Sequence, residues 1–190
     1  MIIDQSKIFF IHIPRTAGTS VEEYLNPGSE LYGRHLNYSE FKERRRKDYK
    51  KFFVFTIVRN PWDRINSCYN WLKQKGAIQD MSMKDYLFYI DSYHKNPGAY
   101  KKDLFIEKHS WWVDESYQDI NMTLKYENIA KEIEILRSVS KIKTGIGQFP
   151  YKNKTSIKTN YTESYDKEGA EIIRSVYSEE IERFGYNLIL

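Results

Sequence analysis

A short apolar run that ends in a polar loop, and is followed by a helical pattern, occurs twice in this chain. Residues 7–13 (KIFFIHI) end at Pro14, and residues 52–58 (FFVFTIV) end at Arg59. Short and nearly continuous apolar runs of this kind are typical of strands that are buried in a parallel sheet. The two runs therefore predict two buried strands, each followed by a loop and a helix.

The helices after the two runs have recognisable starts and ends. The first is expected to extend to about Leu25 and to end at the Asn-Pro-Gly turn of residues 26–28. The second is expected to follow Asn60, a favourable N-cap, with Pro61 in the first helical position and Asp63 in the third.

The rest of the chain continues the alternation. The further expected elements are a helix capped by Ser82, a strand over residues 121–126, a helix from Ile129 to about Val139 capped by Asn128, a long loop over residues 142–161, and a helical C-terminus over residues 166–184 with a break near Ser178. Alternating strands and helices predict an α/β fold with a mainly parallel sheet. Ligands of such sheets bind at the carboxyl ends of the strands, where both loops are expected to lie.

Composition narrows the class of protein further. A length of 190 residues fits one domain with a substantial core, and the 1 cysteine excludes a disulfide framework or a cysteine-based zinc site. No apolar stretch is long enough for a transmembrane helix, and the first residues do not resemble a signal peptide. We therefore expect a cytoplasmic protein without a membrane partner. The net charge of +4 favours an anionic partner without identifying it.

The first loop (PRTAGTS) has the composition of an anion site. Small residues around Gly18 let backbone N–H groups approach a ligand, and the following helix N-terminus adds unpaired donors. Arg15 adds a planar charged fork, while Thr16, Thr19 and Ser20 add hydroxyl groups. A tight strand-to-helix turn with a surface arginine is the simpler alternative. The loop lacks the glycine spacing and the Lys-Ser pair of a Walker A motif, which disfavours an ordinary ATPase or kinase.

The second loop suggests a site for another phosphate. Arg59 leaves the second strand at its carboxyl end, and Ser67 follows about two helical turns later, so that both side chains are expected to converge on one anion. In the alternative, Arg59 forms a salt bridge with a nearby carboxylate. Asp63 and Arg64, which lie between them, are expected to pair with each other or to cap the turn.

Taken together, the two loops resemble those of a known family. IHIPRTAGTS resembles the 5′-phosphosulfate loop of sulfotransferases that use 3′-phosphoadenosine 5′-phosphosulfate (PAPS), and VRNPWDRINSCYNW resembles their 3′-phosphate motif. The closest resemblance is to the heparan sulfate 2-O-sulfotransferases and related carbohydrate sulfotransferases. This resemblance implies a P-loop-NTPase-like three-layer fold and one sulfotransferase domain over residues 1–190. It also implies PAPS as the sulfuryl donor, 3′-phosphoadenosine 5′-phosphate (PAP) as the product, and a carbohydrate hydroxyl as the acceptor.

The resemblance also implies which residues bind the nucleotide. The 5′-phosphosulfate is expected to contact Arg15, Thr16, Ala17, Gly18, Thr19 and Ser20. The 3′-phosphate is expected to contact Arg59 and Ser67. A late loop that closes over the nucleotide is expected at Asn153, Lys154, Thr155 and Ser156. The chain departs from the family pattern at Arg15, where the family usually has lysine. Weaker resemblances cover residues 124–128 (LKYEN) and the ending Phe184-Gly185-Tyr186.

Sulfuryl transfer is an in-line displacement, analogous to phosphoryl transfer, in which an acceptor hydroxyl attacks sulfur. The leaving phosphate needs positive charge, which Arg15 and the loop amides can supply. The acceptor needs a base, and LYGRHLNYSEF resembles the segment with the catalytic histidine of the 2-O branch, which places the base at His35. Gly33 stands where that branch has another histidine. No metal is expected, because the reaction does not require one and no ligand cluster is evident.

Other candidates for the base remain open. The alternatives are His109 and a carboxylate such as Glu40 or Asp63. His12 is expected to be buried, structural and turned away from the first loop, and His94 is expected on the surface.

Two features suit an acceptor or a rival function. The basic run of residues 42–51 (KERRRKDYKK) indicates either a solvated helix face or a docking site for an acidic acceptor. Four aromatic side chains are expected either to pack in the core or to stack on sugar rings: Tyr93, Tyr100, Trp111 and Trp112. The rival functions are a non-catalytic module that binds PAPS, PAP or an anionic glycan, a nucleoside or nucleotide kinase, and a nucleic-acid binder that uses residues 42–51. We expect no nucleic-acid partner.

Overall fold

The computed structural model describes residues 1–25, 35–113, 117–140, 149–150 and 160–188. They form two compact units, each with its own apolar core. The first unit contains residues 1–59 and 109–154, and the second contains residues 60–108 and 155–190. The second unit therefore begins directly after Arg59.

The first unit is built on a sheet of four strands in the order β1 (Ile2–Ile3), β2 (Ile8–Ile11), β3 (Phe53–Val58) and β4 (Met122–Lys125). β2, β3 and β4 are parallel, and β1 is antiparallel to β2. The sheet confirms the predicted α/β class and the predicted strands, although β2 is shorter than expected and ends before His12. β1 was not predicted, because two residues are too few to show a pattern.

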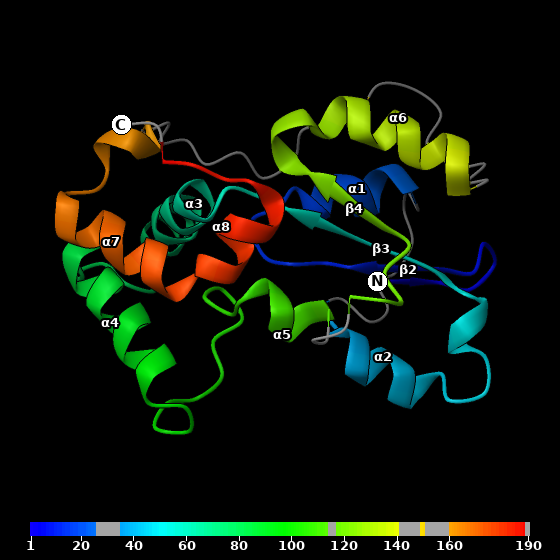
Figure 1. Cartoon of the computed structure of the whole chain (residues 1–190), viewed down its shortest axis with the longest axis horizontal. Coiled ribbons are helices and arrows are strands. Elements are labelled where there is room, and N and C mark those ends of the chain that lie inside the picture. Colours follow the sequence, from blue (N-terminus) through cyan, green and yellow to red (C-terminus); the bar gives the residue numbers. More distant parts are fainter. Residues whose placement is uncertain (26–34, 114–116, 141–148, 151–159, 189–190) are drawn as a thin grey trace. The chain divides into compact units, whose positions relative to one another are not determined.

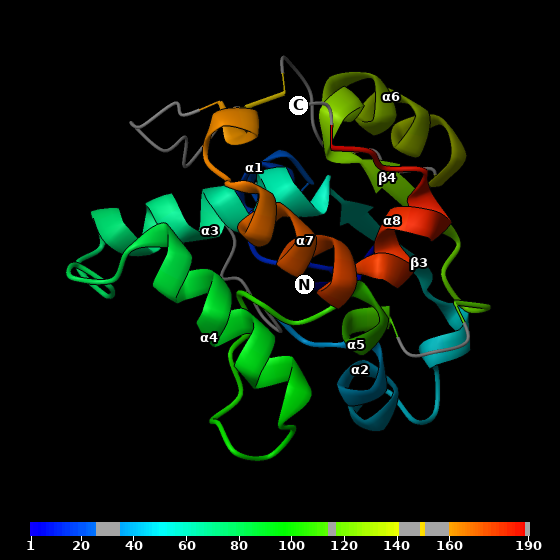
Figure 2. The ribbon, with the colours of Figure 1, turned by 60° about the vertical axis from the view of Figure 1, so that its left-hand side comes forward.

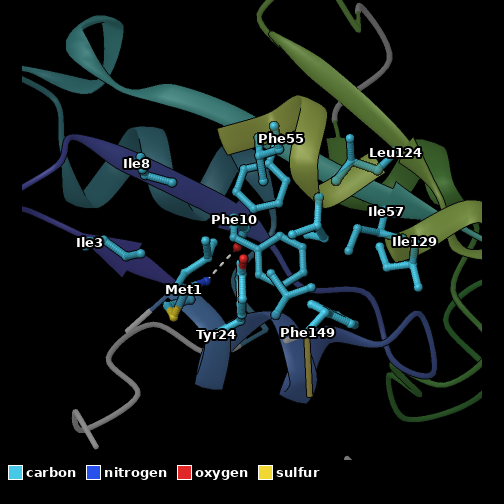
Figure 3. Packing of buried hydrophobic residues seen from close by; sticks show 14 residues of the cluster. Met1, Ile3, Ile8, Phe10, Tyr24, Phe55, Ile57, Leu124, Ile129 and Phe149 are labelled. Atoms are coloured by element: carbon cyan, nitrogen blue, oxygen red, sulfur yellow. Dashed lines mark hydrogen bonds between the residues drawn. The ribbon is translucent and has the colours of Figure 1, made fainter. Parts of the chain in front are cut away.

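Helices cover both faces of this sheet (Figure 1). On one face, α1 (Gly18–Leu25) and α6 (Ile129–Ser140) bury an apolar core against Phe10, Phe55 and other strand residues (Figure 3). On the other face lie α2 (Tyr38–Arg44) and α5 (His109–Val113). Phe9 stacks on Phe41 of α2 with ring centroids 3.9 Å apart, because neighbouring strand residues point to opposite faces. The resulting three layers agree with the expected P-loop-like architecture.

The second unit consists mainly of helices: α3 (Pro61–Gln74), α4 (Met83–Lys95), α7 (Lys167–Val176) and α8 (Ser178–Phe184). α4 packs along α7 (Figures 1 and 2). The core includes Trp62, whose indole N–H donates to the Ala170 carbonyl at 3.1 Å, and Tyr165, whose hydroxyl donates to the Trp62 carbonyl at 2.6 Å. These bonds satisfy the polar atoms that aromatic side chains bring into the core.

Capping side chains explain where four of the described α-helices begin: α2, α3, α4 and α7. The Asn60 side chain accepts from the Trp62 N–H with Pro61 at the start of α3, and Ser82 forms a capping box with Asp85 at the start of α4, as predicted. The break near Ser178 separates α7 from α8, as expected. α2 and α5 were not predicted.

Three short 3-10 helices complete the described fold: η1 (Tyr49–Lys51), η2 (Tyr126–Asn128) and η3 (Tyr161–Glu163). η2 ends at Asn128, and α6 begins at the next residue, Ile129. Asn128 is therefore the last residue of a 3-10 turn that continues into α6, and not the N-cap that the sequence predicts. The turn expected at residues 26–28 and most of the loop expected at residues 142–161 lie outside the described residues. Within the described ranges, no helix combines the length and the apolar character that a membrane crossing needs.

Candidate donor and base site

The first loop connects β2 to α1 through an unusual backbone. Arg15 and Ala17 both have left-handed conformations, with φ of 66° and 67°, and Thr16 between them does not. Non-glycine residues adopt this region only when the surrounding structure imposes it, and such strain concentrates at functional sites. Alternation of this kind turns successive N–H groups to one side and forms an anion-binding concavity. α1 begins immediately afterwards at Gly18, which adds the donors of its first turn.

The side chains of this loop divide into inner and outer groups. Thr16 is fully buried, and its hydroxyl donates to the Ile13 carbonyl at 2.8 Å. Thr16 therefore stabilises the turn from within, whereas the sequence suggested a donor to a ligand. Ser20 is also buried, while Arg15 and Thr19 are partly exposed. The exposed edge of the loop thus presents Arg15 and Thr19 together with backbone atoms.

His12 packs beneath the loop. Its Nδ1 lies 2.8 Å from Glu22 Oε1 on α1, and both side chains are buried. Burial lowers the pKa of His12 to about 4 although Glu22 favours the charged ring, so the ring is neutral at pH 7 and its Nδ1–H donates to the carboxylate. A Cβ on Gly18 would lie 1.9 Å from His12 Nε2. The expectation that His12 faces away from the loop is wrong, because its ring occupies the space that Gly18 leaves open.

His35 lies beside His12 in the same unit. Its Nδ1 is 2.9 Å from the His12 carbonyl oxygen, and the two imidazole centroids are 4.3 Å apart. A carbonyl only accepts hydrogen bonds, so Nδ1 holds the proton and the lone pair of the neutral ring is on Nε2. His35 also has a left-handed backbone, with φ of 58°, and its ring is in an edge contact with Trp112 at 6.3 Å. A histidine with a fixed tautomer is suited to removing a proton.

The alternative bases have other contacts. Glu40 Oε2 accepts from the Asn37 N–H at 2.9 Å in the capping box of α2. His109 is 2% exposed and lies 3.1 Å from the Tyr117 hydroxyl, on whose ring it stacks. His94 is half-buried, not on the surface as expected, and its Nε2–H donates to a backbone carbonyl at 3.0 Å. Burial lowers the pKa of His94.

Arg59 connects the two predicted loops within the first unit. It follows the last residue of β3, and its Nη1 donates to the Arg15 carbonyl at 2.8 Å. Its guanidinium carbon lies 4.0 Å from the ring centroid of Tyr126. The structure therefore brings Arg15, Arg59 and His35 into the same unit, with Arg59 hydrogen-bonded directly to the first loop.

Ser67 and Arg64 belong to α3 in the second unit, and both are buried. Arg64 donates to the carbonyls of Phe105 and Glu107 at 3.2 and 3.1 Å. The expected pairing of Arg64 with Asp63, or its role as a turn cap, is thus wrong. Burial opposes the charge of Arg64, but Glu180 together with Tyr177 and other neighbours outweighs burial, and the pKa of Arg64 lies above its ordinary value. The predicted closing loop of Asn153, Lys154, Thr155 and Ser156 lies outside the described residues.

Sequence reasoning missed Glu22 and Tyr126, and it missed the contact of Trp112 with His35. Glu22 is an acid on the buried side of a short helix, a pattern that usually indicates a partner in the core. Tyr126 and Trp112 gave no signal of their contacts with Arg59 and His35, because those contacts join distant segments. Among the residues described, no three His, Cys, Asp or Glu side chains are grouped to hold a metal ion.

Comparisons with known proteins identify the family. A family model described as the sulfotransferase family matches residues 1–187. Searches among curated proteins and among solved structures found no match.

Proposed function

Because the chain belongs to the sulfotransferase family and is therefore a PAPS-dependent enzyme, we propose that it transfers the sulfuryl group of PAPS to a carbohydrate hydroxyl and releases PAP. The carbohydrate acceptor follows from the resemblance to the 2-O-sulfotransferase branch. We also propose that residues 1–190 act as one sulfotransferase domain, since the family match extends over segments of both units.

The strongest support is the backbone of the first loop. Arg15 and Ala17 have left-handed backbones directly ahead of α1, an alternation typical of N–H concavities that bind anions, and the Arg15 side chain is partly exposed there. This arrangement fits the 5′-phosphosulfate of PAPS, and we assign its binding to Arg15, Ala17, Gly18, Thr19 and the buried Thr16 and Ser20 behind them. Arg15 would stabilise the charge that develops on the leaving phosphate.

Arg59 and Ser67 are assigned to the 3′-phosphate on the spacing of the second motif, and residues 153–156 to closure over the nucleotide. A guanidinium has five N–H donors, so its bond to the Arg15 carbonyl is compatible with phosphate binding. That bond also couples the two halves of the nucleotide site, because Arg59 helps to hold the strained Arg15 backbone.

His35 is assigned as the base. PAPS supplies an activated sulfuryl group, whose bond to the 5′-phosphate breaks as the acceptor oxygen attacks in line. His35 Nε2 takes the proton of the attacking hydroxyl, while its Nδ1–H remains on the His12 carbonyl and keeps the ring in place.

Binding of PAP tests the nucleotide assignment. Arg59→Ala should lower PAP affinity by about 100-fold or more, because it removes a charged partner of the 3′-phosphate. Isothermal titration with PAP measures this effect, and Arg174→Ala, which removes an exposed arginine of α7, is the matched control. Unchanged affinity of Arg59→Ala would refute the assignment. A thermal shift with Mg-ATP but not with PAP would favour a kinase instead.

Release of PAP over a panel of glycans tests the reaction. His35→Ala should bind PAP like the wild type but transfer sulfuryl groups about 10²–10⁴-fold more slowly. Partial recovery of the rate by added imidazole would support the role of a base. Undiminished transfer by His35→Ala would move that role to another residue.

A further inference from the structure

Exposed cations gather in the segment between α2 and β3. Arg44, Lys47, Lys50 and Lys51 are exposed, and within the described ranges none of their four side chains has an ion pair or hydrogen bond. Arg46 lies 3.9 Å from Glu43, but their side chains are 79% and 75% exposed, so the pair contributes little. We call Arg44, Arg46, Lys47, Lys50 and Lys51 the basic surface.

The basic surface contains the excess positive charge of the protein. Residues 42–51 have seven cations and two acids, which gives +5, while the whole chain has +4. The remaining residues therefore have a net charge of −1. Elsewhere in the described chain, Arg137 and Arg174 each lie within about 3.2 Å of a glutamate of their own helix. The basic surface differs from these neutralised helix faces.

Hydrogen bonds and a ring contact attach this segment to the start of the chain and to Phe52. Arg45 donates to Asp4 and, at 3.1 Å, to Asp48, and its guanidinium carbon lies 5.0 Å from the Phe52 ring. Lys7 donates to Asp48 at 3.2 Å from the other side. The backbone closes a turn, in which the Asp48 N–H donates to the Arg45 carbonyl at 2.9 Å. A fixed scaffold reduces the entropy that binding would cost.

The basic surface lies far from the first loop (residues 14–20), which we propose binds the sulfuryl donor. Lys50 and Lys51 lie just before β3, whereas Arg59 follows it, and the six residues of β3 at about 3.3 Å each separate these two ends by about 20 Å. In Figure 1, the cyan segment after α2 leads into the start of the β3 arrow, and the arrow points away from that segment. One nucleotide cannot contact both places. A ligand that reaches both must be an extended chain.

We infer that the basic surface is a docking site for a polyanionic glycan, a polysaccharide with carboxylates or sulfates on its sugars. Positive charge holds the glycan at the basic surface, while another sugar of the same polysaccharide supplies the acceptor hydroxyl. This second role rests on the proposed function, but binding itself does not. Among the described residues the exposed large apolar side chains are Phe88, Tyr100, Ile135 and Val139. None belongs to the basic surface, which disfavours base stacking and insertion into a membrane.

Four substitutions to glutamine test the inference: Arg44→Gln, Lys47→Gln, Lys50→Gln and Lys51→Gln combined in one variant. A control variant loses the same charge at exposed lysines outside the segment: Lys75→Gln, Lys101→Gln, Lys131→Gln and Lys167→Gln. Binding of fluorescent dextran sulfate and polygalacturonate is followed by anisotropy over a series of salt concentrations, with uncharged dextran alongside. PAP binding and melting temperature report on the integrity of both variants.

The wild-type protein should bind both polyanions and not dextran. The first variant should lose affinity by about tenfold or more and show a weaker dependence on salt, because fewer cations release counterions. The control variant should stay within about twofold of the wild type, and PAP binding should be unchanged in both.

Three outcomes would overturn the inference. These are equal losses in both variants, no binding of either polyanion by the wild type, and tighter binding of poly(U) or anionic phospholipid vesicles through the same four residues. A protein that binds the polyanions through these residues but neither binds PAP nor transfers sulfuryl groups would refute the proposed function and leave the docking site standing.

Discussion

At the scale of single residues, the loop between β2 and α1 is shaped by one buried imidazole. The His12 ring lies against Gly18, and its Nδ1–H donates a hydrogen bond to Glu22. The backbone carbonyl of His12 accepts a hydrogen bond from His35 and orients that ring. One residue thus supports both the first loop and His35, the proposed base. The requirement for glycine at position 18 arises from this contact as much as from any ligand.

Gly18→Ala should lower both stability and PAP affinity. The added Cβ would lie 1.9 Å from the His12 ring, so the ring or the loop must move, and overpacking of this kind costs roughly 1–3 kcal/mol. Thermal unfolding and PAP titration measure the two effects. If steric overlap is the cause, combining Gly18→Ala with His12→Ala should cost less than the sum of the single changes. Strict additivity would contradict this cause.

The buried His12 should also make stability depend on pH. Its pKa is about 4 in the folded protein and near 6.5 when unfolded, so between these values the unfolded chain binds more protons. Stability due to this group is complete above pH 6.5 and decreases by about 3 kcal/mol as the pH falls to 4. Urea unfolding at several pH values measures the slope.

His12→Asn is the matched variant for this slope, because the Asn amide can still donate to Glu22 but does not titrate. The wild-type protein should lose more stability than His12→Asn between pH 6.5 and 4. Parallel curves of stability against pH for the two proteins would contradict this prediction, because they would mean that His12 binds a proton as readily in the folded protein as in the unfolded chain.

At the scale of elements, the ends of β2 and β3 are joined by Arg59 and not only by the sheet. The guanidinium donates to the Arg15 carbonyl and stacks on Tyr126 of η2, which follows β4. Parallel neighbours bring these three strand ends to one edge, as the α/β pattern predicts. The contact with Tyr126 was not predictable, because it depends on how η2 turns after the strand.

Tyr126→Leu should weaken PAP binding by about threefold to thirtyfold, since a half-buried cation–π contact contributes about 0.5–2 kcal/mol. Tyr126→Phe keeps the aromatic face and should bind PAP like the wild type. Titration with PAP compares the two. Equal loss in both variants would mean that the hydroxyl, and not the ring, supports Arg59.

At the scale of the whole molecule, the chain divides into two compact units. Residues 60–108 leave the first unit directly after Arg59 and return to it at His109. Arg64 illustrates the consequence: within the second unit it bonds the carbonyls of residues 105 and 107, which a local pattern cannot reveal. Composition gives no boundary between the units, because both have apolar cores of similar chemistry.

The sequence alone determined the three parallel strands, the caps of α3 and α4, the first loop and the family, because these depend on local patterns and short motifs. Only the tertiary structure decided the strained backbone at Arg15 and Ala17, the tautomer of His35, the burial of Thr16 and the bond from Arg59 to the first loop. It also separated the basic surface from that loop by the length of β3. These features depend on contacts between segments far apart in sequence, and neither composition nor spacing encodes which atoms meet.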